Sequence, residues 1–62
     1  MKEEMVMVRD ADGNEIYVGA HIGDCREWCK IHNITGANGE YIAHGTFDTE
    51  TRYFECEDYE EI

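Results

Sequence analysis

The chain has 62 residues, with 15 acidic and five basic side chains, and so a formal net charge of −10 at pH 7. A chain of this length forms one domain at most and buries only about 60% of its unfolded surface. Aromatic residues make up 11% of the sequence, more than an acidic disordered tail carries. We therefore expect one folded acidic domain over residues 1–62. Direct binding to nucleic acid is disfavoured, because phosphates would repel this charge.

The sequence has no apolar run near the roughly 18 residues that cross a membrane, and its start, MKEEMVMV, lacks a cationic leader region. We therefore expect no membrane partner and a cytoplasmic location. Thiols stay reduced in the cytoplasm, and three cysteines are an odd number for a disulfide framework.

Taken in chain order, residues 5–9 (MVMVR) and 16–18 (IYV) have strand character. The residues between them include Asp12-Gly13-Asn14, which is typical of a hairpin turn because glycine and asparagine tolerate a positive φ. The first segment therefore predicts an antiparallel hairpin.

A helix is predicted from about Cys25 to His32. Asp24 is a good N-cap, and Glu27 three residues later completes a pattern like a capping box. Asn33, or Gly36 slightly later, suits the C-terminal end.

Two further strands are predicted at residues 40–47 and 51–57, joined by the short turn DTE. The order is therefore ββαββ. The fold class that this order favours is α+β, with an antiparallel sheet of about four strands and one short helix packed across a face. Two hairpins held apart by the helix are the alternative.

The predicted helix carries Cys25, Trp28, Cys29 and His32 on one stripe, at positions i, i+3, i+4 and i+7. Cysteine is among the most buried residue types, and tryptophan buries a large apolar area. We therefore interpret Cys25, Trp28 and Cys29 as core residues, with His32 at the rim of the stripe.

The same cysteines allow two chemical alternatives. Cys25, Cys29, His32 and Cys56 would supply four zinc ligands in number, but Cys25 and His32 would lie about 10.5 Å apart along the helix axis. Redox helices have C-x-x-C, whereas the spacing here is C-x-x-x-C. We expect no metal and no cofactor. Because no catalytic motif is present either, we expect neither an enzyme nor a small-molecule substrate.

Acidic residues concentrate at the C-terminus. Residues 43–62 contain seven carboxylates against one arginine, a local net charge of −6. Alternation along the last strand predicts that Arg52, Phe54 and Cys56 face the core, whereas Tyr53, Glu55 and Glu57 face water. Glu55 and Glu57 would stand about 6.7 Å apart, close to the rise of about 6.8 Å over two steps of a DNA strand.

This C-terminal half, GTFDTETRYFECEDYEEI, together with the compact αβ plan, resembles the small acidic inhibitors that phages and mobile elements carry against host nucleases. Anti-CRISPR proteins and DNA-mimic anti-restriction proteins belong to this type. The resemblance implies an inhibitor, acting in the host cytoplasm, that binds a basic nucleic-acid-binding protein such as a CRISPR effector complex or a restriction enzyme. Its action would be steric mimicry of nucleic acid or a block of conformational change.

The candidate partner-binding residues are the acidic and tyrosine side chains of this half: Asp48, Glu50, Tyr53, Glu55, Glu57, Asp58, Tyr59, Glu60 and Glu61. Tyrosine is enriched as an anchor at protein interfaces. Two other functions stay open, a structural or assembly accessory protein of a phage or bacterium and a small zinc-binding domain.

Overall fold

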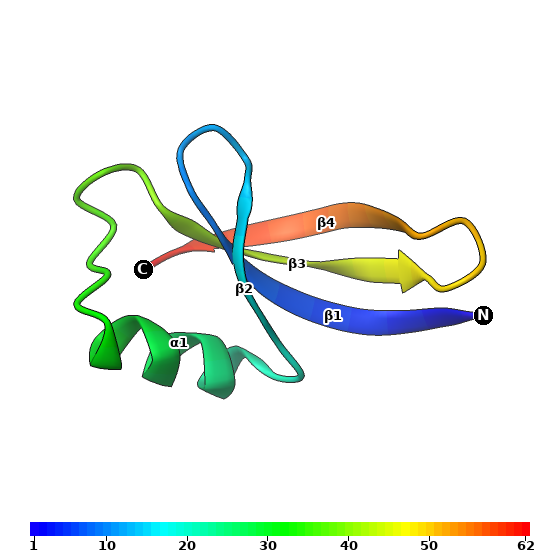
Figure 1. The fold of residues 1–62 in the computed structure, drawn as a ribbon, viewed down its shortest axis with the longest axis horizontal. Coiled ribbons are helices and arrows are strands. Elements are labelled where there is room, and N and C mark those ends of the chain that lie inside the picture. The colour runs from blue at the N-terminus through cyan, green and yellow to red at the C-terminus, as the bar shows by residue number, and fades with distance from the viewer.

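The computed structural model describes residues 1–62 and confirms the α+β fold with ββαββ order. The elements are β1 (Lys2–Arg9), β2 (Glu15–Gly19), α1 (Ile22–Ile31), β3 (Tyr41–Asp48) and β4 (Tyr53–Glu61). Figure 1 shows the four strands with the helix against one side of the sheet. The helix lacks the length and apolar character that crossing a membrane would require.

All four strands belong to a single antiparallel sheet in the order β2-β1-β3-β4. The central pair joins β1 to β3 along their whole lengths, from Lys2 opposite Asp48 to Arg9 opposite Tyr41. This pairing excludes the alternative of two separate hairpins. It also places β1 and β3 in the interior of the sheet, so that their apolar residues form its buried part.

Two strands extend three or more residues beyond the predicted segments, whereas β2 (Glu15–Gly19) extends by one residue at each end. β1 begins at Lys2 and includes two glutamates, and β4 continues to Glu61 through a run of acidic residues. Charged residues have low strand propensity, which is why the sequence alone ends these strands early. Both extensions pair with β3, and backbone pairing therefore outweighs the local preference.

The helix begins three residues before the predicted start. Its N-cap is His21, so the prediction of Asp24 as N-cap is wrong. Asp24 instead occupies the third helical position, and its carboxylate accepts hydrogen bonds from the backbone N–H groups of Ala20 and His21, both at 3.2 Å. One carboxylate thus satisfies two donors just before the helix.

The helix ends where a left-handed residue follows it. Asn33 has φ +57°, which confirms it as the C-terminal residue predicted by sequence. The N–H of Ile34 donates to the carbonyl of Cys29 at 2.8 Å, and the N–H of Asn33 donates to Lys30 at 3.4 Å. These two bonds form a Schellman motif. The motif directs the chain back over the sheet and seats Ile34 against the core.

The core lies between α1 and the sheet and is small. Its buried members are Val6, Val8, Cys25, Cys29 and Ile42. Partly buried residues pack around them, including Trp28, which is therefore at the edge of the core rather than fully within it. The structure confirms Cys25 and Cys29 as core residues, whereas the prediction of Trp28 as a core residue is correct only in part. His32 is exposed.

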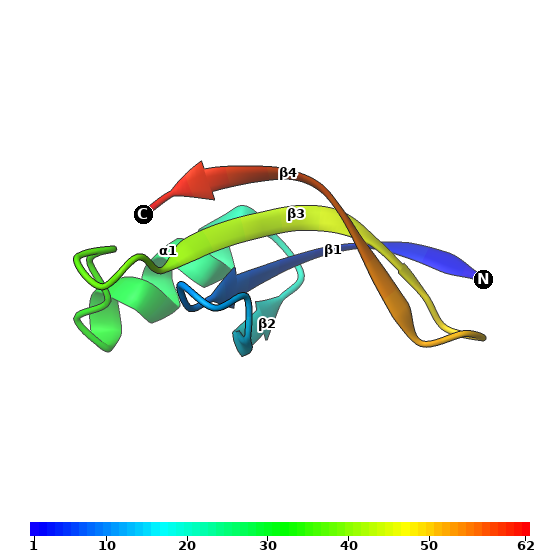
Figure 2. The same cartoon turned by 90° about the horizontal axis from the view of Figure 1, so that it is seen from above.

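The helix covers only one end of the sheet. In Figures 1 and 2 the turn between β3 and β4 and the N-terminus lie together at the opposite end, where no helix covers the strands. At this far end only β3 is paired on both sides, because β2 joins β1 only from Val6 to Arg9. Phe47 and Phe54 are half-buried there, without a helix above them.

Candidate protein-binding surface

A β-bulge decides which side chains of β4 share a face. Gly45 pairs with Cys56 and His44 pairs with Asp58, so that Glu57 is an extra residue with no partner of its own. An extra residue shifts the alternation of side chains by one position. The odd-numbered residues before the bulge and the even-numbered residues after it consequently point to the same side of the sheet.

The side shared in this way is the one on which α1 lies. Residues directly opposite each other in an antiparallel pair share a face, and Ile42 of the helix-side core stands opposite Glu60. The same side of β3 carries His44, Thr46 and Asp48, which stand opposite Asp58, Glu55 and Tyr53. Thr46 also donates a hydrogen bond to Glu57. This helix-side acidic face therefore contains Tyr53, Glu55, Glu57, Asp58 and Glu60. All five side chains are exposed, which confirms that Tyr53, Glu55 and Glu57 face water.

The opposite face of β4 carries Phe54, Cys56, Tyr59 and Glu61. The prediction that Cys56 and Arg52 turn toward the core is wrong. Cys56 is exposed, and Arg52 lies in the turn before β4 with φ +61°. β4 is an edge strand that extends past the helix, and no second layer covers this face of it. Phe54 is the only half-buried residue in the strand.

Some carboxylates of the predicted set already have a basic group nearby. Glu60 lies 2.9 Å from His44 Nε2 and 3.8 Å from Arg26. The terminal amino group lies 3.9 Å from Asp48 and 3.7 Å from Glu50, at the far end of the sheet. These contacts are exposed, so each contributes little to stability.

The remaining carboxylates have no cation within 4.0 Å. Glu57 accepts a hydrogen bond from the Thr46 hydroxyl at 3.2 Å, and Asp58 accepts one from the backbone N–H of Tyr59 at 2.8 Å. Glu55 and Glu61 make no side-chain hydrogen bond at all. The uncompensated negative charge of β4 is therefore centred on Glu55, Glu57 and Asp58 on the helix side, with Glu61 on the other face.

The two tyrosines of the predicted set point to opposite faces. Tyr53 belongs to the helix-side acidic face, and Tyr59 stands opposite Ala43 on the other. Tyr53 is 65% exposed and Tyr59 is 67% exposed. A partner that approached one face alone would contact only one of them, whereas a partner that lay along the β4 edge would reach both.

The four cysteine and histidine residues that could have bound zinc do not come together. Cys25 and Cys29 are buried beneath the helix, His32 is exposed at its end, and Cys56 lies on the other face of the sheet. Burial raises the pKa of both Cys25 and Cys29 above the ordinary thiol value. These two thiols therefore stay protonated, which is unfavourable for metal binding and for redox chemistry.

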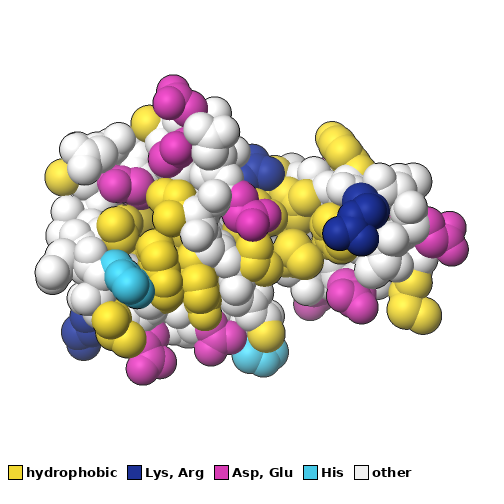
Figure 3. Space-filling model, viewed as in Figure 1, with side chains coloured by type: hydrophobic (Ala, Val, Ile, Leu, Met, Phe, Trp, Pro, Cys, Tyr) yellow, Lys and Arg dark blue, Asp and Glu magenta, His cyan; other side chains and the backbone are white.

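The molecular surface combines apolar and acidic areas. Figure 3 shows hydrophobic side chains gathered over one part of the molecule and continuing along the sheet, with acidic side chains dispersed around them. Exposed apolar residues include Ile16, Val18 and Ile31. The visible face therefore carries an apolar area with acidic side chains scattered near it.

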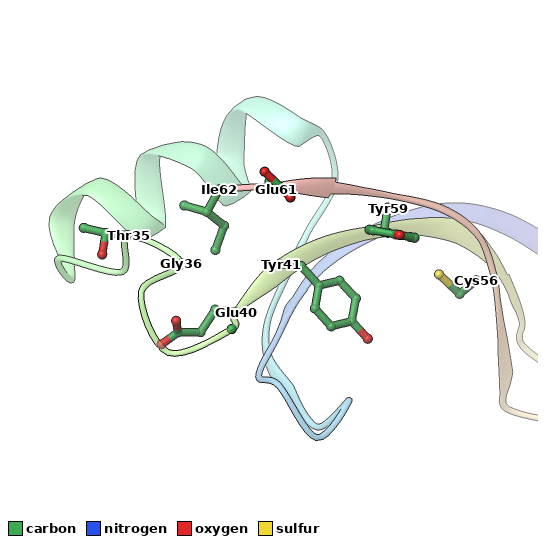
Figure 4. A pocket seen from close by; sticks show the side chains of 9 residues that line it. Thr35, Gly36, Glu40, Tyr41, Cys56, Tyr59, Glu61 and Ile62 are labelled. Carbon is green, nitrogen blue, oxygen red and sulfur yellow. The ribbon is translucent and has the colours of Figure 1, made fainter.

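A hollow of about 590 Å³ lies at the C-terminal end of β4. Its lining includes Tyr41, Glu40 and Ile62, which the sequence did not single out, beside Tyr59, Cys56 and Glu61 (Figure 4). No local pattern could have found them, because the loop at residues 35–40 meets the chain terminus only in the folded protein.

No protein-family model, curated protein or solved structure shows significant similarity to this chain.

Proposed function

We propose that the protein is an inhibitor that binds a basic nucleic-acid-binding protein, such as a CRISPR effector or a restriction enzyme, and blocks the access of DNA or RNA to it. The cytoplasm, where such enzymes work, is the proposed location. The observation that carries the proposal is the bulge at Glu57, which aligns Glu55, Glu57 and Asp58 on one exposed face without cationic partners.

The charge distribution supports binding rather than a purely solvating role. Edge strands often carry charges that prevent pairing with other chains, and the acids of β4 also serve this purpose. However, a net charge of −10 on 62 residues exceeds the magnitude of about 2 to 8 that keeps a small domain soluble. Self-repulsion also lowers the stability of a domain whose core is small.

The first experiment identifies and tests the partner. Immobilised protein is used to isolate partners from bacterial lysate, and each purified partner is then assayed for displacement of a labelled DNA or RNA. Mimicry predicts that the protein competes with the nucleic acid. It also predicts weaker binding as salt rises, because the screening length decreases from about 10 Å at 0.1 M to about 3 Å at 1 M.

The second experiment tests the helix-side acidic face. Replacing Glu55 and Glu57 with glutamine and Asp58 with asparagine changes the net charge from −10 to −7, since three acids become neutral. We expect slower association and weaker competition, because rim charges act mainly on the association rate. Replacing the same three residues with lysine should abolish binding.

A matched control separates position from total charge. The variant with Asp12→Asn, Glu15→Gln and Glu27→Gln has the same net charge of −7, but its changes lie away from β4 in the hairpin and helix. This control should compete almost as well as the wild type. Salt-insensitive binding that tolerates the lysine variant would contradict the proposal.

A further inference from the structure

The hollow at the C-terminal end of β4 is built from three separate segments. The loop at residues 35–40, the first residue of β3 and the end of β4 border an open hollow of about 590 Å³, a volume within the range of about 300 to 1,000 Å³ found for ligand sites. In Figure 4, Tyr41, Tyr59 and Cys56 follow one another along the sheet, and Ile62 and Glu40 lie toward the other end of the hollow.

The lining combines aromatic and acidic groups. The rings of Tyr41 and Tyr59 meet edge to face, with centroids 5.9 Å apart and 73° between their planes. Glu40 and Glu61 also line the hollow, and no lysine, arginine or histidine does so. Glu61 has no ion pair, and Glu40 accepts only one backbone hydrogen bond, from Asn38 at 3.1 Å.

These groups have the chemistry that recognises a cation on an apolar stem. A guanidinium stacks on a tyrosine ring, donates two parallel hydrogen bonds to a carboxylate, and leaves its methylene groups for apolar contact. Ile62 lines the hollow and, although it also packs against the core, offers that apolar contact with its remaining exposed surface. An anion would be repelled by Glu40 and Glu61, and a neutral ligand would leave both carboxylates without a partner.

We propose that this hollow, the arginine hollow, receives an arginine side chain exposed on the basic partner. The inference rests on the proposed function, because it names the chemistry of the partner residue that the same protein recognises. It adds a specific anchor to the diffuse attraction of the helix-side acidic face. The hollow lies at the end of the edge strand β4, so a partner lying along that edge reaches both.

A test that needs no natural partner uses a capped peptide, Gly-Gly-Arg-Gly-Gly, and the same peptide with citrulline in place of arginine. Citrulline has nearly the same shape but no charge. Chemical-shift changes in the amide spectrum should locate the arginine peptide at Tyr41, Tyr59 and Ile62. The arginine peptide should also slow alkylation of Cys56, which lines the hollow and is the single exposed cysteine. The citrulline peptide should do neither.

Variants of the lining give the expected magnitudes. Tyr59→Ala removes an exposed ring, and Glu61→Gln removes an unpaired charge, so both variants should fold normally. Each should weaken binding of the arginine peptide about five- to tenfold, the range for losing a cation–π contact or a charge-assisted hydrogen bond. Glu15→Gln in β2 and Glu27→Gln in α1 are charge-matched controls outside the hollow, and should leave binding unchanged.

The outcomes separate this proposal from the proposed function. Equal binding of the two peptides, shifts confined to Glu55, Glu57 and Asp58, or unchanged binding by both lining variants would overturn the arginine hollow. Salt-dependent competition with nucleic acid, measured on the isolated partner, would still support the acidic inhibitor in each of those cases.

Discussion

The indole ring of Trp28 stacks on the phenol ring of Tyr17, with centroids 5.0 Å apart and 11° between the ring planes. The imidazole of His32 lies on the indole as well, at 4.5 Å and 34°. The first contact joins α1 to β2, the short edge strand opposite β4. A half-buried aromatic pair thus fastens the helix to the sheet beside a core that is otherwise made of small side chains.

We predict that Trp28→Ala lowers the free energy of unfolding by about 2 kcal/mol. Emptying a fully buried aromatic site costs about 3–5 kcal/mol, and Trp28 loses less because it is only partly buried. In a domain of this size the change lowers Tm by about 10 °C. Trp28→Phe retains a stacked ring and should lose less than half as much. A Tm unchanged by Trp28→Ala would show that the stack does not support the fold.

Gly45 stands where the bulge brings β4 close to β3. A Cβ added there would lie 2.8 Å from Phe54 Cζ and would collide with the carbonyl oxygen of Glu55. We predict that Gly45→Ala destabilises the protein by at least about 2 kcal/mol, because the backbone of β4 must move. Thermal unfolding measures the loss.

The control for Gly45 is Gly23, a helical glycine with nothing within 4 Å of an added Cβ. Gly23→Ala should stabilise the protein by about 0.5–1 kcal/mol, because alanine favours the helix. Similar Tm changes in the two variants would contradict the close approach at the bulge.

The three cysteines should react at very different rates. Cys56 is exposed, whereas Cys25 and Cys29 are buried and burial raises the pKa of each thiol. Iodoacetamide at neutral pH should therefore label one thiol per folded chain, and Cys56→Ser should abolish that labelling. Mass spectrometry counts the labels. Denaturant should expose the other two thiols. Rapid labelling of a second thiol in the folded protein would contradict the burial of Cys25 and Cys29 between the helix and the sheet.

The same thiols predict a stability change at alkaline pH. Their folded pKa is raised, so the stability linked to them is present below about pH 8.5, the ordinary thiol value. It is lost as pH rises toward the folded pKa, because the unfolded chain then releases protons that the folded protein keeps. Tm should decrease between pH 8 and pH 10. The decrease in Tm from its value at pH 7 should be smaller for Cys29→Ala than for the wild type.

Asp10 predicts the opposite dependence at acid pH. Hydrogen bonds from the Asn14 backbone and side-chain amide, at 2.8 and 3.2 Å, lower the pKa of Asp10. The stability linked to its ionised form is therefore present above about pH 4 and is lost as pH falls through the folded pKa. The Tm difference between wild type and Asp10→Asn should decrease toward acid pH, and a difference that stays constant would contradict the role of these bonds.

Much of the fold could be predicted from the sequence because its signals are local. The turn Asp12-Gly13-Asn14, the spacing of Cys25 and Cys29, and the left-handed Asn33 each depend on residues within a few positions. Local preferences of this kind give the order ββαββ and the buried face of the helix. The sequence itself also shows that the C-terminal half is acidic.

Only the tertiary structure decided how the acidic residues of β4 are distributed. β4 follows β3 to Glu61 against its own propensity, because long-range pairing satisfies its backbone groups. The extra residue Glu57 then reverses the alternation, so that Asp58 joins Glu55 on one face while Tyr59 turns to the other. A pattern of period two cannot reveal a bulge, since the close approach of the two strands at Gly45 exists only in the folded protein.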